Sequence, residues 1–296
     1  MQTIMSTFNF NRFSQALKCH FLVERKSWIR LFGIYTLVLF MANLFFTRVN
    51  GFSYSSMEEG IETGSWSMEE LIRTYTQHVE QTSVFGVVFF CIAMLFCASF
   101  MFSQMKDTRK RSAYLLWPVS NLEKYVVSLL YSIVLMAVLT IAAYVLADAL
   151  RVFIDSLTGR IIVWGTPMIF TRIIYSPAFE HWQMVWMLFN WVFYFHSLYI
   201  VGGTLFRRQQ FLMTSATIAV VVILLIIVLN QIDWNSVNID FINGTWDEKT
   251  KTYTTIFHPF FYILNTAVTL FIPIHYWISY KLFTRMQVIN NKWLNV

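Results

Sequence analysis

Ile218 to Leu229 reads IAVVVILLIIVL, an unbroken run of aliphatic residues. Extended to Gln209 and Ile232, the stretch still holds no charged side chain. At about 1.5 Å per residue, a helix of this length crosses a hydrocarbon core of about 30 Å. Lipid offers the backbone no hydrogen-bond partners, so a helix is required there. We therefore predict a transmembrane helix, and its aliphatic surface predicts that it faces lipid.

Five further stretches of the chain are long and apolar enough to cross a membrane. Hydrophobic residues make up 57% of the 296 residues and charged residues only 13%, against about 25% charged in soluble domains. This composition excludes a water-soluble fold and predicts an all-α integral membrane protein, a single transmembrane domain over residues 1–296. The predicted spans are residues 28–47, 81–105, 121–147, 182–206, 209–232 and 256–280.

The basic residues divide the connecting segments into two alternating sets. One set, residues 1–30, 106–124, 207–208 and 281–296, holds 15 of the 22 Lys and Arg residues and three acidic ones. The other holds seven basic and 13 acidic residues, so the formal charges are +12 and −6. Basic loops stay in the cytoplasm, which predicts that both termini are inside. The first 27 residues have no unbroken apolar region and no small-residue cleavage site, so we predict no cleaved signal peptide. The expected outer loops are 48–80, 148–181 and 233–255, and the main cytoplasmic loop is 106–120.

Residues 8–27, before the first span, are amphipathic. Apolar side chains recur there at helical spacing, while the basic ones fall mostly elsewhere around the helix. This pattern predicts a helix lying in the inner membrane interface. The alternative is a cytoplasmic helix packed on the spans. The residues concerned are Phe10, Phe13, Leu17, Phe21, Arg25 and Lys26.

Two outer loops carry local structure signals. Ser67 and Glu70 fit a capping box, which predicts a short acidic helix running to about Glu80. In the last outer loop, Val237, Ile239 and Phe241 alternate with polar residues and predict a strand. A turn at Asn243–Gly244 or at 247–250 would lead back into 252–256 as a small β-hairpin. The middle outer loop is apolar enough to be expected to bury against the spans.

The loop between the second and third spans is the most informative segment for function. It begins with a basic cluster, continues with the apolar run Tyr114-Leu-Leu-Trp117, and is interrupted by Pro118, which disfavours a continuing helix. Ser120 and Glu123 then predict a second capping box at the start of the third span. A short helix that exposes apolar groups is suited to docking a partner. The alternative is an interfacial helix with Tyr and Trp at headgroup level.

The loop sequence YLLWPVSNLEK, together with the amphipathic N-terminal helix and six spans, resembles the small bacterial permease subunits of ABC-2 type ABC transporters. In that family the loop between the second and third spans holds a coupling helix that docks on the ATPase, and the N-terminal helix acts as an elbow. The resemblance implies an elbow role for Phe10 to Lys26. It implies a docking role for Arg109, Lys110, Arg111, Tyr114, Leu115, Leu116 and Trp117.

The same resemblance implies the partners and the function. The chain would pair with itself or with a related permease chain in the bacterial inner (plasma) membrane. Two cytoplasmic ATPase subunits would bind ATP and Mg, and the complex would export a hydrophobic or amphipathic compound. The predicted hairpin departs from the family pattern, where many members have re-entrant helices, and the first outer loop is longer and more acidic than expected.

The chain shows no motif for chemistry of its own. It has no Gly-x-x-x-x-Gly-Lys-Ser/Thr loop and no His-Glu-x-x-His pair, so we predict no enzyme, no metal and no cofactor bound by this chain. His196 and His275 are interpreted as structural, and the three cysteines give no disulfide framework. Polar residues within spans mark either a pathway or hydrogen bonds between helices, the second being favoured. They include Asn43, Asn190, Ser197, Asn265 and Thr269.

A second function class is motivated by the acidic outer loops. A non-transporting assembly factor or envelope-stress sensor would use that region to bind a ligand or partner. It predicts no associated ATPase, which separates it from the permease.

Overall fold

A computed structural model describes residues 8–48, 54–102, 104, 108–175, 181–206, 209–231, 242–247 and 252–285. The chain forms two compact units. The first unit joins Met1–Cys97 with Val119–His181, and the second joins Ala98–Pro118 with Trp182–Val296. The prediction of one transmembrane domain over residues 1–296 stays a prediction.

Six helical segments are long and apolar enough to span a membrane, as the sequence predicts. The chain therefore has the architecture of a multi-pass membrane protein, whereas the side on which each terminus lies stays a prediction. The segments are α1 (Phe10–Arg48), α3 (Met68–Ser99), the continuous stretch Asn121–Leu157, α9 (Trp182–Leu205), α10 (Gln210–Leu229) and α11 (Pro259–Arg285).

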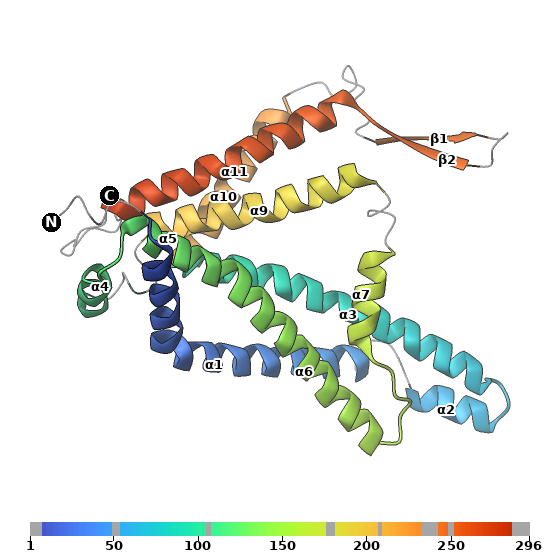
Figure 1. Ribbon diagram of the computed structural model, residues 1–296. Coiled ribbons are helices and arrows are strands. Elements are labelled where there is room, and N and C mark those ends of the chain that lie inside the picture. The colour runs from blue at the N-terminus through green and yellow to red at the C-terminus, as the bar shows by residue number, and fades with distance from the viewer. Residues whose placement is uncertain are drawn as a thin grey trace. The chain divides into compact units, whose positions relative to one another are not determined.

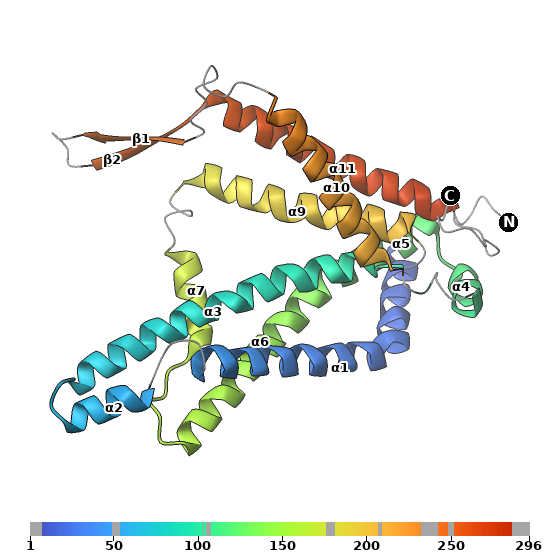
Figure 2. The same ribbon diagram turned by 180° about the vertical axis from the view of Figure 1, so that it is seen from behind.

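In the first unit, α1 packs against the third span, which consists of α5 (Asn121–Leu130), a π-helical turn η2 (Tyr131–Leu135) and α6 (Met136–Leu157). Figures 1 and 2 show α1 running beside α5 and then beside α6. The buried core between these helices includes Tyr35 and Leu39 of α1 and Met136, Ala143 and Ala147 of α6.

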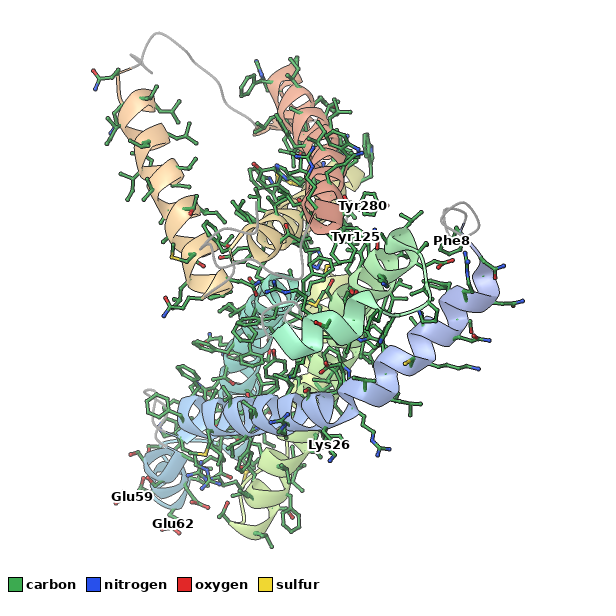
Figure 3. The ribbon with its side chains drawn as sticks, turned by 90° about the vertical axis from the view of Figure 1, so that its left-hand side faces the viewer. Phe8, Lys26, Glu59, Glu62, Tyr125 and Tyr280 are labelled. Carbon is green, nitrogen blue, oxygen red and sulfur yellow. The ribbon has the colours of Figure 1, made fainter. Side chains whose placement is uncertain are left out.

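The N-terminal amphipathic segment and the first span form one continuous helix, not two. The expected change from an interfacial segment to a span at residues 27 and 28 stays a prediction, since the helix is continuous there. Residues 10–32 contain no proline or glycine to break the helix. The helix bends instead near Lys26 (Figure 3), where its partner changes from α5 to α6.

The predicted capping box at Ser67 is confirmed, but the predicted short helix is not a separate element. Ser67 N–H donates to Glu70 Oε2 at 2.9 Å, and Glu70 N–H donates to Ser67 Oγ at 3.2 Å. The helix that begins there continues as α3 through residue 81 to Ser99, because no helix breaker intervenes. A separate short helix, α2 (Tyr54–Glu62), precedes it, and the sequence did not predict that helix.

The middle outer loop is shorter than predicted. The third span extends past residue 147 to Leu157, and α7 (Gly165–Ile174) occupies part of the remainder. Ile169 of α7 packs against the core of the first unit, and Val163 is buried just before it. The expected burial of this loop is therefore confirmed in part, since Ile162, Trp164 and Phe170 remain exposed.

The second unit contains α4 (Thr108–Leu115), α9, α10, α11 and a two-stranded sheet. Helix α9 packs along both α11 and α10. Gly202 of α9 lies so close to Thr214 of α10 that a Cβ atom there would collide with the threonine side chain. Beyond that crossing, residues 220–229 of α10 remain exposed, which agrees with the prediction of a lipid-facing helix.

The predicted hairpin is present. Strands β1 (Ile242–Asp247) and β2 (Thr252–Phe257) pair antiparallel, with Asn243 opposite Ile256 and Gly244 opposite Thr255. Asn243 and Gly244 therefore lie within a strand, so the first of the two predicted turn positions is wrong. The second position falls between the strands. The strand predicted over Val237, Ile239 and Phe241 lies outside the described residues.

Candidate functional site

The predicted coupling segment forms the helix α4, as its sequence suggests. Tyr114 is buried, and its ring centroid lies 5.3 Å from that of Trp117 and 6.4 Å from that of Phe283 on α11. Phe283 in turn stacks on Phe102 at 4.7 Å. An aromatic cluster therefore anchors α4 to the end of α11.

The remaining residues of this segment differ in exposure. Leu116 is 81% exposed and Lys110 is also exposed, whereas Arg111 is only 2% exposed. Arg111 is therefore not on the surface that α4 offers to a partner. The side chains of Arg109 and Leu115 lie outside the described residues. The accessible part of the predicted docking loop is thus centred on Leu116, with Lys110 contributing positive charge.

The second predicted capping box is confirmed and has an additional role. Ser120 N–H donates to Glu123 Oε2 at 2.7 Å, and Glu123 N–H donates to Ser120 Oγ at 3.2 Å. The other carboxylate oxygen of Glu123 accepts from the Asn9 backbone at 2.7 Å and pairs with Arg12 at 3.2 Å. Glu123 therefore fixes the start of the third span and the start of α1 at one point.

The N-terminal half of α1 is packed on one side and exposed on the other. Phe13, Ala16 and Leu17 pack against Val127 and Tyr131 of the third span. Phe10 and Phe21 are 73% and 49% exposed, and Arg25 and Lys26 are also exposed. The helix combines both predicted arrangements, because one face contacts the spans while a second apolar face stays open.

Polar residues of α9 and α11 bond to one another. The Asn190 amide donates to the Asn265 carbonyl at 3.1 Å, and the Thr269 hydroxyl donates to Asn190 Oδ1 at 3.1 Å. Ser197 Oγ lies 3.0 Å from His275 Nδ1. These contacts support the favoured interpretation that Asn190, Ser197 and Thr269 join helices.

His196 is buried and has a hydrogen-bond partner on the facing helix. Its Nδ1 lies 3.0 Å from the Tyr276 hydroxyl. Both histidines within the spans thus contribute to the contact between α9 and α11. Among the residues that the structure describes, no three His, Cys, Asp or Glu side chains are arranged to hold a metal ion.

Asn43 and Asn265 each have one buried side-chain atom without a hydrogen-bond partner within the described part of the chain, Nδ2 of Asn43 and Oδ1 of Asn265. Asn43 is 7% exposed. A buried unpaired amide is costly, so it is retained in proteins mostly where water, a ligand or strain explains it. Asn43 and Asn265 are therefore the sequence-predicted polar residues best suited to a role beyond helix packing.

A buried charge cluster on α6 was missed by the sequence analysis. Arg151, 1% exposed, donates to Asp148 at 2.7 Å, to Asp155 at 2.8 Å and to the Val163 carbonyl at 2.6 Å. Asp148 also accepts a hydrogen bond from the Thr166 backbone N–H at 2.8 Å, and Asp155 accepts one from the Tyr75 hydroxyl at 3.0 Å. The spacing Asp148-x-x-Arg151-x-x-x-Asp155 places all three charges on one face of a helix. This spacing is the feature of the sequence from which the cluster could have been predicted.

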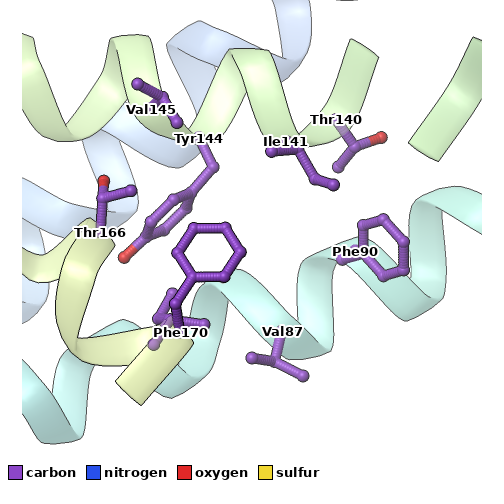
Figure 4. A pocket seen from close by; sticks show the side chains of 10 residues that line it. Val87, Phe90, Thr140, Ile141, Tyr144, Val145, Thr166 and Phe170 are labelled. Atoms are coloured by element: carbon purple, nitrogen blue, oxygen red, sulfur yellow. The ribbon is translucent and has the colours of Figure 1, made fainter. Parts of the chain in front are cut away.

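An apolar cavity of about 200 Å³ lies one helical turn from this cluster, between α3, α6 and α7 (Figure 4). Its wall includes Phe90, Ile141 and Phe170, and it contains no charged residue. Tyr144 stands at one end, packed so closely on Gly86 that a Cβ atom there would collide with the ring. A cavity of this size and polarity accepts a hydrocarbon segment or a small aromatic group.

No protein-family model, curated protein or solved structure matches this chain. The resemblance to ABC-2 permeases rests on the loop motif and the architecture alone.

Proposed function

We propose that this chain is the transmembrane permease subunit of an ABC-2 type exporter, with ATP hydrolysed by a separate cytoplasmic subunit. The observation that carries the proposal is the segment formed by α4 and the turn that follows it, between two spans, in which Tyr114 is buried and Leu116 is 81% exposed. A segment that is anchored by one aromatic side chain and exposes an apolar side chain directly after its helix is suited to insertion in a groove of a partner protein.

The position of α4 within the second unit supports a coupling role. The helix belongs to the same compact unit as α9, α10 and α11. Contacts of Tyr114 and Phe102 with Phe283 connect it to α11, and the hydrogen bonds of Asn190 and Ser197 connect α11 to α9. A displacement of α4 by an ATPase would therefore act directly on two spans, because coupling travels through packed contacts.

The proposed cargo is a hydrophobic or amphipathic compound. The cavity between α3, α6 and α7 supports this, since its wall lacks charge and lies among apolar helices. The permease would work as a pair, with itself or with a related chain, in the bacterial inner membrane with both termini inside. ATP and Mg would be bound by the ATPase subunits.

The docking role is tested by co-purification from the native host. Leu116→Asp places a charge on the exposed apolar residue directly after α4, and we expect the yield of copurifying ATP hydrolysis to fall at least tenfold, since about 1.4 kcal/mol of lost binding corresponds to a factor of ten. Leu157→Asp is the matched control, because Leu157 is 70% exposed at the far end of α6. It is expected to retain the ATPase.

Two results would contradict this proposal. An ATPase that copurifies equally with wild type and Leu116→Asp would exclude α4 as its docking site. Wild-type protein from its own membrane that carries no ATP hydrolysis at all would favour the sensor or assembly factor. That class would use the carboxylates exposed on α2, Glu58, Glu59 and Glu62.

A further inference from the structure

An open apolar groove runs between the N-terminal half of α1 and the third span. Leu17 and Phe21 form one wall, and Leu130, Tyr131, Val134, Leu135 and Val138 form the other. Its volume is about 300 Å³, and Val134 and Val138 are 54% and 60% exposed. Its base is fixed, because the Tyr131 hydroxyl donates to the Leu17 carbonyl at 2.8 Å.

The length of the groove fits one lipid chain. Leu130 and Val138 are eight residues apart, which corresponds to about 12 Å along a helix. The groove lies along the beginning of the third span, just after the cap at Ser120 and Glu123. An acyl chain that enters there would run alongside the span.

The rim of the groove is basic. Lys18 precedes Phe21 by three residues and Arg25 follows it by four, so both lie on the helix face that carries Phe21. Both side chains are exposed, and Lys26 adds a third exposed cation next to them. Glu24 is the one acidic residue in this stretch of α1, so the net charge of the rim is positive.

The π-helical turn contributes a local distortion to the same place. Tyr131, Val134 and Leu135, which line the groove, all belong to the segment Tyr131–Leu135. Such turns are uncommon and occur frequently at functional sites. Trp28 stacks on Tyr131, with ring centroids 5.7 Å apart, and supports its position from the α1 side.

We propose that this groove is a binding site for an anionic phospholipid of the surrounding bilayer, with one acyl chain along Leu130–Val138 and the phosphate headgroup near Lys18 and Arg25. An apolar trough with a cationic rim complements a lipid that carries a negative headgroup on a hydrocarbon chain. The site is separate from the α4 surface and does not depend on the permease function.

The experiment uses the full chain in phosphatidylcholine nanodiscs that contain a trace of phosphatidylglycerol with a photoreactive acyl chain. After illumination, mass spectrometry locates the labelled peptides. We expect labelling on the peptides that contain Phe21 and Val134, and weaker labelling there by a phosphatidylcholine probe with the same chain. Lys18→Gln and Arg25→Gln should each lower the preference for phosphatidylglycerol about fivefold, since each cation near the membrane surface contributes about that factor.

Two control variants separate the groove from the general lipid shell. Val134→Trp fills the groove and should remove its labelling, whereas Val222→Trp changes a similarly exposed valine of α10 and should leave it intact. Lys110→Gln removes an exposed cation elsewhere and should not change the headgroup preference. Equal labelling by both headgroups, unchanged labelling of Val134→Trp, or cross-links from these peptides to a second copy of the chain would overturn the proposal.

Discussion

Arg151 is a buried charge whose hydrogen-bonding groups are satisfied by several neighbouring residues. Its guanidinium is held by Asp148, Asp155 and the Val163 carbonyl, and Asp155 is also paired with Arg48 at 3.2 Å. The cluster thereby links α1 and α6 with the segment that leads into α7. Removing one member of such a cluster leaves charges buried without partners, and this loss exceeds the net contribution of the intact pair.

We expect Arg151→Met to destabilise the protein by about 3–5 kcal/mol, because it leaves the buried Asp148 without a cation and Asp155 with Arg48 alone. The measurement is the midpoint of thermal unfolding in detergent, compared with that of Arg73→Met. Arg73 is an exposed arginine on α3 and should tolerate the change. Unfolding of both variants at the same temperature would contradict the role assigned to the cluster.

Single residues also show what sequence reasoning could reach. Polarity within apolar stretches was enough to select Asn190, Ser197 and Thr269, which the structure joins by hydrogen bonds between α9 and α11. The charge cluster was missed because residues 148–181 were interpreted as a loop, so Asp148, Arg151 and Asp155 were not placed on one helix. The exposure of single side chains could not be predicted from the sequence either. Lys110 and Arg111 are adjacent and chemically alike, yet Lys110 is exposed and Arg111 is buried.

Among the helices, glycine determines how closely two elements approach. Gly203 of α9 lies against Ser99, and a Cβ atom at this glycine would stand 2.5 Å from the serine carbonyl oxygen. A backbone atom cannot rotate away as a side chain can. Close contacts of small residues are a common basis of helix packing in membranes.

We expect Gly203→Ala to cost about 1–3 kcal/mol, since an added methyl group in a filled interface forces the helices apart. Gly33→Ala is the matched control: a Cβ at Gly33 of α1 meets nothing within 4 Å. Alanine is favoured over glycine within a helix by about 1 kcal/mol, so this variant should be neutral or slightly more stable. The two thermal midpoints should move in opposite directions. If both thermal midpoints moved in the same direction, close packing of Gly203 against Ser99 would be excluded as the cause of the destabilisation.

Element boundaries were predictable where local chemistry sets them. Ser67 and Ser120 begin helices because their caps depend on residues three positions away. The continuity of α1 and α3 was not predictable, because it depends on partners distant in the sequence. For the same reason α2 was missed: it is held by Tyr54 and Met57, which pack against Leu71 and Tyr75.

For the whole molecule, the separation of charge predicts the topology. The structure contains six candidate spans, the number that the alternating loop charges predict. The helices alone do not show which side of the membrane is cytoplasmic. The difference between +12 and −6 predicts that side through the positive-inside rule. Glu62 at the end of α2 and Lys110 on α4 are predicted to lie on opposite sides of the membrane, and both are exposed.

We expect a cysteine at position 62 to react with a membrane-impermeant maleimide in intact cells, and a cysteine at position 110 to react only after the membrane is permeabilised. Cys19, Cys91 and Cys97 are first replaced by alanine, since two of them are exposed. Labelling after permeabilisation confirms that each introduced thiol is accessible. The reverse pattern would invert the topology and place α4 out of reach of any cytoplasmic ATPase, so this measurement tests the orientation on which the permease proposal depends.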